Sequence, residues 1–184
     1  KRKGSNESVV ISNSKTKRKK NNNAHRDLCI KAGRWLMRPH PLAPTCPYVA
    51  VEIVTATPET PDVFGWNYWT SVLIEVKMSR SDFLADKKKP FRILPDDGIG
   101  EHRYYCCPDG LIKSDELPEK WGLIYEVNGK LEVVKNAERQ VVNHRAEITI
   151  CTSIMRREGI KPKLFARRRQ EVKGRLVKWL SPKH

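Results

Sequence analysis

Hydrophobic and polar residues alternate most clearly in two segments of the first half of the chain, residues 48–55 and 70–77. A period of two residues is typical of a β-strand, whose side chains point alternately to the two faces of a sheet. A shorter strand is expected between them, over residues 62–66. The expected faces are Val49, Val51 and Ile53 against Tyr48, Ala50, Glu52 and Val54 in the first segment, and Val72, Ile74 and Val76 against Leu73, Glu75 and Lys77 in the other.

Helical spacing of apolar residues precedes these strands and returns after them. Leu28, Ala32 and Leu36 predict a helix that starts at Ala24 and ends before Pro39. A second helix is expected to begin at Ser79 or Ser81, with Asp82 in its first turn and Pro90 beyond its end. Residues 144–158 favour a helix, although the segment 148–150 alone would also suit a strand.

Three further strands are expected in the second half, over residues 103–107, 121–127 and 130–135. The Asn128-Gly129 pair between the last two is a strong hairpin signal. The element order is therefore helix, three strands, helix, strand, and then more strands and helices. This order predicts an α/β domain with a central mixed sheet flanked by helices.

The chain ends have a different character from this central part. Residues 1–23 are polar and basic, and we expect them to form a flexible arm before a domain over residues 24–158. Residues 159–184 carry an apolar stripe among many basic residues, which predicts a basic amphipathic helix. The stripe consists of Phe165, Val172, Leu176 and Trp179.

Composition excludes several classes of protein. The 184 residues are 39% hydrophobic and 31% charged, which is typical of a soluble globular protein, and no apolar run reaches the roughly 18 residues that a membrane span requires. No apolar signal segment opens the chain, so we expect a cytoplasmic, nucleoid-associated protein without a membrane partner rather than a secreted one. Five cysteines without CxxC spacing indicate buried, reduced thiols. The pattern does not set an oligomeric state.

The net charge of +15 is concentrated at the two ends. Residues 1–26 hold nine Lys or Arg against one acid, and residues 156–184 hold eleven against two, whereas residues 27–155 have a net charge of −2. A polyanion is the expected partner, and the charge does not distinguish DNA from RNA because phosphates carry the charge in both polymers. The candidate nucleic-acid-binding residues are Lys17, Arg18, Lys19, Lys20, Lys87, Lys88, Arg167, Arg168 and Arg169.

Three acids and one lysine on the expected strands form the candidate catalytic group, namely Glu52, Asp62, Glu75 and Lys77. If the three strands are neighbours, their carboxylates converge, and a divalent cation would remove the repulsion between them. Asp62 and Glu75 are the candidate ligands, and Mg²⁺ or Mn²⁺ is the expected ion. The alternative is that Glu75 and Lys77 form an ion pair on a half-exposed sheet. The histidines show no His-His metal spacing, so no histidine metal site is expected.

The spacing Pro61-Asp62, then Glu75-x-Lys77, matches the PD-(D/E)xK phosphodiesterase signature. The longer block from Glu75 to Lys88, EVKMSRSDFLADKK, resembles that of the MmcB-like DNA-repair proteins, a bacterial branch of the PD-(D/E)xK nuclease-like superfamily. The segments YYCCP at 104–108 and WGLI at 121–124 resemble the same family, so the resemblance spans about residues 24–157. The basic arm and the basic C-terminal helix are not part of it.

The resemblance implies a restriction-endonuclease-like core with Asp62, Glu75 and Lys77 at the catalytic positions and Glu52 on the preceding strand. Within this block, Asp86 either pairs with a basic neighbour or holds Lys77 in place. The implied activity is that of an Mg²⁺-dependent phosphodiesterase, an endodeoxyribonuclease of DNA repair, restriction or mobile-element DNA processing. The alternative is a non-catalytic nucleic-acid-binding module on a nuclease-like fold, and a more remote one is an RNA-binding or RNA-processing protein.

Overall fold

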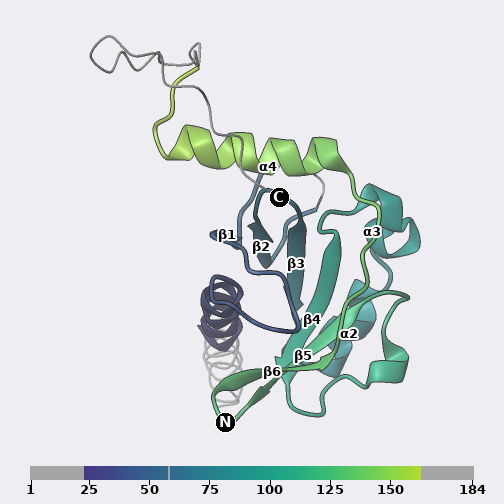
Figure 1. The fold of residues 1–184 in the computed structure, drawn as a ribbon. Coiled ribbons are helices and arrows are strands. Elements are labelled where there is room, and N and C mark those ends of the chain that lie inside the picture. The colour runs from purple at the N-terminus through teal and green to yellow at the C-terminus, as the bar shows by residue number, and fades with distance from the viewer. Residues whose placement is uncertain (1–22, 58, 163–184) are drawn as a thin grey trace, which may run out of the picture.

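A six-stranded mixed sheet forms the centre of the computed structural model, which describes residues 23–57 and 59–162. The strands lie in sequence order across the sheet (Figure 1). β1 to β3 form an antiparallel meander, β4 and β5 run parallel to β3, and β6 returns antiparallel to β5. The bounds are β1 Tyr48–Val51, β2 Val63–Trp66, β3 Ser71–Val76, β4 His102–Pro108, β5 Gly122–Val127 and β6 Lys130–Lys135.

Helices flank this sheet. The first helix occupies residues 23–36, and it is followed by α2 at Arg80–Asp86, α3 at Pro90–Ile93 and α4 at His144–Arg157. Ser79 starts α2 as predicted, since its Oγ accepts a hydrogen bond from the Asp82 N–H at 3.2 Å. Within residues 23–57 and 59–162, no helix is long and apolar enough to cross a membrane.

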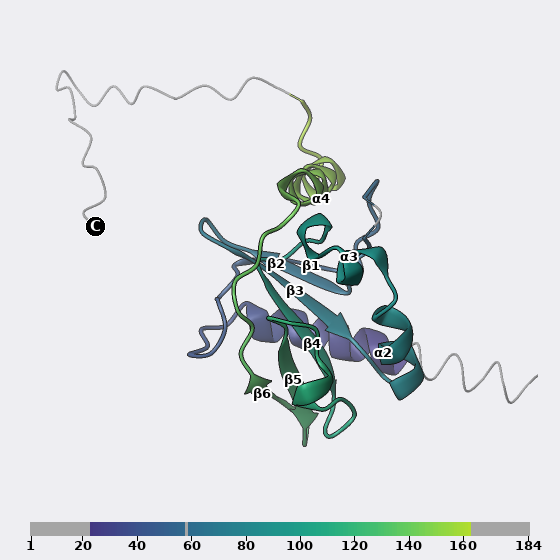
Figure 2. The ribbon, with the colours of Figure 1, turned by 90° about the vertical axis from the view of Figure 1, so that its right-hand side faces the viewer.

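Each face of the sheet has its own hydrophobic core. The first helix packs its Leu28 and Leu36 with Val72 and Ile74 on one face. On the other face, Phe83 of α2 and Ile150 of α4 belong to the core that contains Leu73 of β3. In Figure 2 the purple first helix lies behind the sheet and α2 in front of it, while α4 lies above the strands. The predicted α/β fold, a mixed sheet flanked by helices, is therefore confirmed.

A glycine in β2 allows the first helix to approach the sheet closely. A Cβ atom at Gly65 would lie 2.5 Å from Leu36 Cδ2 and 2.9 Å from the Cys46 Cβ. Any larger residue would therefore push the helix away from the strand. The first helix consequently sits directly over the edge of the sheet at which the candidate acids lie.

The first strand is shorter than the alternation predicts. It ends at Val51 because Glu52 adopts a left-handed backbone conformation with φ of 49°. Beyond this residue the alternation is interrupted, and Ile53 joins the second core although Val49 and Val51 pack against the first. The ambiguous segment 148–150 is helical and lies within α4.

The five cysteines are free thiols, as predicted, and Cys106 and Cys107 point into opposite cores. The first helix includes Asn23, which the sequence analysis assigned to the arm. Of the predicted basic arm over residues 1–23 and the predicted C-terminal helix over 159–184, residues 1–22 and 163–184 lie outside the described residues. These include the candidate contacts Lys17, Arg18, Lys19, Lys20, Arg167, Arg168 and Arg169.

Candidate active site

Glu52, Asp62 and Glu75 occupy neighbouring positions at one end of the antiparallel meander. Val51 pairs with Val63, and Val63 pairs with Ile74. Because the strands are antiparallel, the next row of the sheet contains Glu52 after Val51, Asp62 before Val63 and Glu75 after Ile74. The Glu52 N–H donates a hydrogen bond of 2.8 Å to the Asp62 carbonyl oxygen, which continues this register. The strands are therefore neighbours, as the sequence analysis assumed.

Asp62 is fixed between β3 and the first helix. Its Oδ2 accepts the backbone N–H of Val76 at 2.8 Å and lies 3.5 Å from Nε2 of His25. The negative charge of Asp62 also contributes to raising the pKa of both Glu75 and Lys77. Asp62 thus lies close enough to both residues to form one electrostatic group with them.

Glu75 and Lys77 form a buried ion pair, with 3.0 Å between Oε2 and Nζ. The alternative that the two residues pair on a half-exposed surface is therefore wrong, because the side chains of Glu75 and Lys77 are only 2% and 4% exposed. Burial alone would lower the pKa of Lys77, but the charges of Glu75, Asp86 and Asp62 outweigh it and raise the pKa above its usual value. Lys77 is therefore a cation at neutral pH.

Asp86 is the second carboxylate that contacts this lysine, with its Oδ1 3.2 Å from Lys77 Nζ. Its Oδ1 also lies 2.7 Å from Lys89 Nζ, and its Oδ2 accepts hydrogen bonds from Arg92 at 2.8 Å and the Tyr105 hydroxyl at 2.7 Å. The two roles that the sequence analysis considered for Asp86 are therefore both realised: it pairs with a basic neighbour and it contacts Lys77.

Arg92 joins three acids of this buried group, which the sequence analysis did not anticipate. Its guanidinium lies 2.8 Å from Glu59, 2.8 Å from Asp86 and 3.4 Å from Glu75, and it stacks over the ring of Trp121. Glu59 in turn accepts the N–H of Ile99 at 3.0 Å. Three acids and three cations thus balance one another: Glu59, Glu75 and Asp86 against Lys77, Lys89 and Arg92.

Sequence patterning offered little indication of this group. Arg92 lies in the four-residue helix α3, which starts at Pro90, and Glu59 lies in the segment between β1 and β2. Neither residue follows a periodic pattern. A useful signal would have been the segment from Lys87 to Arg92, which carries four cations and overlaps the end of the matched block.

One oxygen of Glu75 accepts no hydrogen bond, although it lies near the guanidinium of Arg92. The pKa of Glu75 is raised above its usual value, chiefly by burial and also by the negative charge of Asp62. The positive charges of Lys77, Arg92 and Lys89 oppose this rise. Glu75 Oε1 is buried and has no hydrogen-bond partner among the described residues, and the Nη2 of Arg92 lies 3.4 Å from it. Together with the neighbouring Asp62 carboxylate, this oxygen fits a hard cation that takes one or two carboxylates and completes its shell with phosphate and water oxygens.

Glu52 does not share the environment of Glu75. Its carboxylate contacts the first helix, with Oε2 3.2 Å from Arg26 Nη1 and Oε1 3.5 Å from His25 Nδ1. The first helix covers the sheet face opposite to α2. The expectation that Glu52 and Glu75 project from one face is therefore wrong, because the left-handed conformation of Glu52 redirects its side chain.

His25 bridges the two acids at the strand ends. Its ring nitrogens face Glu52 and Asp62, and its side chain also contacts the Cys29 thiol one helical turn later. Hydrogen bonding to Asp62 and Cys29 raises the pKa of His25 to about 11, although partial burial opposes the shift. His25 was not among the expected site residues, since the sequence analysis considered only His-His spacings.

The described candidates for nucleic-acid contact have different surroundings. Lys87 donates a hydrogen bond of 2.8 Å to the Glu116 carbonyl oxygen and packs over the Phe83 ring, whereas Lys88 is exposed. The turn between β2 and β3 carries Tyr68 and Trp69, which are 83% and 85% exposed. Trp66 instead stacks between Tyr48 and Phe64. Tyr68 and Trp69 therefore offer free aromatic surface for stacking.

A basic groove, which the sequence analysis missed, lies between the first helix and the β5–β6 hairpin. It has a volume of about 600 Å³. Lys31 and Arg34 lie one turn apart on the first helix, Arg38 follows the end of this helix, and Lys130 is the first residue of β6. The lining consists of Asp27, Ile30, Lys31, Arg34, Trp35, Arg38, Gly129, Lys130 and Leu131.

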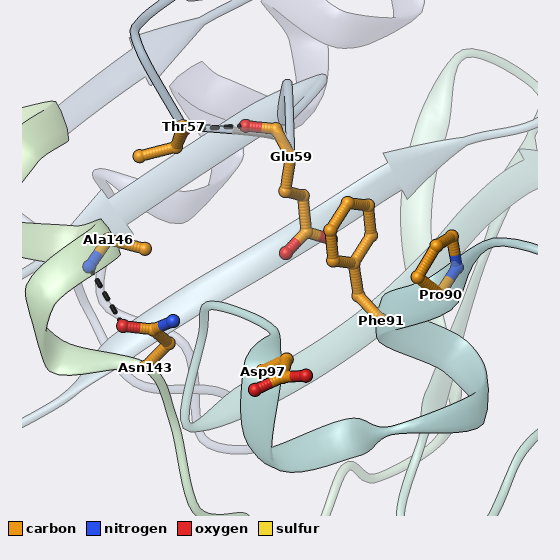
Figure 3. A pocket seen from close by; sticks show the side chains of 7 residues that line it. All are labelled: Thr57, Glu59, Pro90, Phe91, Asp97, Asn143 and Ala146. Carbon is orange, nitrogen blue, oxygen red and sulfur yellow. Dashed lines mark hydrogen bonds between the residues drawn. The ribbon is translucent and has the colours of Figure 1, made fainter.

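A smaller pocket of about 290 Å³ lies beside Glu59 (Figure 3). Its other lining residues belong to turns and helix starts, and Figure 3 shows the cap bond in which Asn143 accepts the N–H of Ala146 at 3.0 Å. The lining consists of Thr57, Glu59, Pro90, Phe91, Asp97, Asn143 and Ala146. None of Asp62, Glu75 and Lys77 lines it, so it is separate from the strand-end acids.

No protein-family model matches the chain, and no curated protein sequence matches it. A solved structure, described as a protein of unknown function from Silicibacter pomeroyi, is 25% identical in sequence with a TM-score of 0.46. The similarity covers 60% of this chain and 75% of that one.

Proposed function

We propose that the chain is a metal-dependent phosphodiesterase that cleaves nucleic acid, with DNA favoured over RNA and Mg²⁺ or Mn²⁺ as the cofactor. The observation that supports this most directly is the arrangement at the ends of β2 and β3. Asp62 and Glu75 occupy adjacent register positions there, and the Lys77 ammonium lies 3.0 Å from Glu75 Oε2.

Asp62 and Glu75 would hold the cation, which supplies charge neutralisation and an activated water at the scissile phosphate. Lys77 is already protonated, because its neighbouring carboxylates raise its pKa. It therefore acts in the proposal as a fixed positive charge that stabilises the negative charge developing on the phosphate, rather than as the base that removes a proton from water.

The remaining members of the buried group are positioning residues. Asp86 contacts Lys77 from α2, and Arg92 connects Asp86, Glu75 and Glu59. A buried ammonium with two carboxylate partners has little freedom to move, and such preorganisation is what electrostatic stabilisation of a transition state requires. The resemblance of the block from Glu75 to Lys88 to DNA-repair proteins supports a role for the proposed activity in repair, restriction or mobile-element DNA processing.

A second candidate function is non-catalytic nucleic-acid binding, and one observation favours it. Three cations already surround Glu75, at 3.0 Å for Lys77, 3.4 Å for Arg92 and 3.7 Å for Lys89. A carboxylate neutralised in this way needs no metal ion. In this alternative the charged group only stabilises the fold, and the basic groove and ends bind the polymer.

Cleavage assays with the full chain separate the two functions. Duplex, nicked, branched and single-stranded DNA, and RNA, would be incubated with Mg²⁺ or Mn²⁺, with EDTA in parallel reactions. We expect metal-dependent cleavage of DNA by the wild type and at least a 100-fold loss in Lys77→Met. Lys77→Met retains the length of the buried side chain, and Lys113→Met, at an exposed position between β4 and β5, is the matched control.

Binding measured in the same samples completes the test. Lys77→Met should retain its affinity for DNA within a few-fold, because a buried side chain makes no contact with the phosphate backbone outside the site. Circular dichroism would confirm that both variants are folded. Equal cleavage by wild type and Lys77→Met, or DNA binding without any cleavage, would reject the enzyme in favour of the binding module.

A further inference from the structure

Four side chains with metal-binding atoms meet where the first helix passes the ends of β1 and β2. His25 and Cys29 are four residues apart, so both lie on one face of the helix, and Asp62 comes from the residue before β2. A nitrogen of His25, the Cys29 sulfur and a carboxylate oxygen of Asp62 all lie within 4.8 Å of one another. Within residues 23–57 and 59–162, this is the one such group of three donors.

Glu52 adds a fourth donor at the rim of this group. Its Oε1 lies 3.5 Å from His25 Nδ1, and the His25 Nε2 is 3.5 Å from Asp62 Oδ2. The left-handed backbone at Glu52 is unfavourable for a non-glycine residue, and it turns the carboxylate toward the helix. The strained residue thus directs one more oxygen ligand toward the histidine.

The depth of the four groups suits an ion that enters from solvent. Cys29 is fully buried, whereas the side chains of Asp62, His25 and Glu52 are 20%, 27% and 32% exposed. The thiol therefore forms the floor of the group, and the other three donors form its open side. Because His25 and Asp62 are partly exposed, an ion can approach them from solvent without unfolding the first helix.

We propose that His25, Cys29 and Asp62, with Glu52 as a fourth oxygen donor, form a binding site for Zn²⁺ or a similar transition-metal ion. One imidazole nitrogen, one thiolate and two carboxylates are a donor set suited to a tetrahedral Zn²⁺ site. A thiolate and an imidazole select such an ion over Mg²⁺, which prefers oxygen ligands alone.

This site differs from the proposed Asp62–Glu75 site in its ion and in three of its donors. Because Asp62 belongs to both, an ion held by His25 and Cys29 would withdraw Asp62 from the other site. The zinc site does not depend on the proposed nuclease activity, because its donors and their spacing involve neither Glu75 nor Lys77. The most direct structural effect of a bound ion would be to link the first helix to the end of β1 and the start of β2.

Cobalt(II) titration of the reduced, EDTA-stripped full chain tests the site without any activity assay. Co²⁺ serves as the probe because a cobalt–thiolate bond has a near-ultraviolet charge-transfer absorption that oxygen and nitrogen ligands do not give. We expect this absorption to saturate at one equivalent of Co²⁺ and to disappear when Zn²⁺ is added. A rise in the melting temperature with Zn²⁺, but not with Mg²⁺, should accompany it.

Variants assign the donors. Cys29→Ala should abolish the absorption, and Cys46→Ala, an equally buried thiol without a histidine neighbour, should retain it. His25→Gln should weaken Co²⁺ binding at least 10-fold, whereas His144→Gln, at an exposed position, should not change it. Asp62→Asn provides a second test on a partly exposed residue if Cys29→Ala does not fold.

The proposal is overturned if the wild type shows no cobalt–thiolate absorption, or if the absorption survives in Cys29→Ala or in both His25→Gln and Asp62→Asn at unchanged affinity. These outcomes are independent of nuclease activity. Failure of the zinc site would leave the Mg²⁺-dependent cleavage assays unaffected, and absence of cleavage would leave the cobalt titration unaffected.

Discussion

Asp86 Oδ1 lies 3.2 Å from Lys77 Nζ, and this contact connects α2 to the end of β3. Lys77 therefore lies between two carboxylates, those of Asp86 and Glu75, and its ring neighbour Tyr105 donates a hydrogen bond to the same Asp86 side chain. The lysine is held from two secondary-structure elements at once, so substitutions at Asp86 should affect both stability and the orientation of Lys77.

Asp86→Asn should destabilise the fold by about 3–5 kcal/mol, because it removes one partner from a buried group that keeps three cations. If Asp86 positions Lys77, cleavage should also fall while the affinity for DNA stays within a few-fold of wild type. Urea unfolding and single-turnover cleavage would measure the two effects. Asp82→Asn, at an exposed position of the same helix, should change neither.

The stability of the wild type should decrease below about pH 4, partly through Asp86. Burial alone would raise the pKa of Asp86, but Arg92, Lys77, Lys89 and Tyr105 together hold it well below its usual range. The contribution is complete above the unfolded-state pKa of about 3.9 and is lost as the pH falls toward the lower folded-state value. Urea unfolding between pH 7 and pH 3 should therefore give a steeper acid loss for wild type than for Asp86→Asn. Parallel curves would contradict this assignment.

Two glycines with similar backbone conformations should respond differently to alanine. Gly100 and Gly110 have φ of 81° and 70°, so both substitutions incur the cost of a left-handed non-glycine residue, about 1 kcal/mol. A Cβ at Gly100 would also lie 2.6 Å from the Leu73 Cβ and 2.7 Å from the Leu73 backbone nitrogen, whereas a Cβ at Gly110 meets nothing within 4 Å. Gly100→Ala should therefore lower the free energy of unfolding by at least 2 kcal/mol more than Gly110→Ala. Equal effects would show that β3 can move away from Gly100.

Trp69 should contribute to binding single-stranded nucleic acid. It is 85% exposed at the turn between β2 and β3, so it can stack on a base without displacing protein contacts. Trp69→Ala should weaken binding by roughly 1–3 kcal/mol and leave the melting temperature unchanged. Fluorescence anisotropy with a labelled oligonucleotide would measure the affinity, and Leu94→Ala, an exposed apolar residue of another surface, is the control. Unchanged affinity in Trp69→Ala would exclude stacking at this turn.

Salt dependence of DNA binding should identify which basic residues contact phosphates. Each contact contributes about 0.9 to the slope of log affinity against log salt concentration on duplex DNA. Replacing Lys17, Arg18, Lys19 and Lys20 by alanine should flatten this slope by up to about 3.6 units, and Arg34→Ala with Arg38→Ala should test the basic groove in the same way. Lys31 is less suitable for this test because it pairs with Glu126. Identical slopes would mean that the substituted residues do not touch DNA.

The sequence by itself determined the order of the elements and most of their positions. Val72, Ile74 and Val76 alternate with Leu73 and Glu75, and the apolar run is long enough to predict a buried central strand, which β3 is. Local sequence also predicted the start of α2 at Ser79 or Ser81, the hairpin turn at Asn128-Gly129 and the bounds of β6. Capping and tight turns depend only on neighbouring residues, so they can be predicted without the tertiary structure. The pairing of Glu75 with Lys77 also follows from their separation of two residues on one strand.

Only the tertiary structure decided how the candidate acids divide. Alternation placed Glu52 with Glu75, but a left-handed backbone at Glu52 turns its carboxylate to His25 and Arg26 on the opposite face. The cations Lys89 and Arg92 reach Glu75 from the residue before α3 and from the single turn of α3. The thiol of Cys29 reaches Asp62 from a helix 33 positions earlier in the chain. Such contacts depend on how helices dock on a sheet, and docking is set by the packing of both cores together, which periodicity within one segment does not encode.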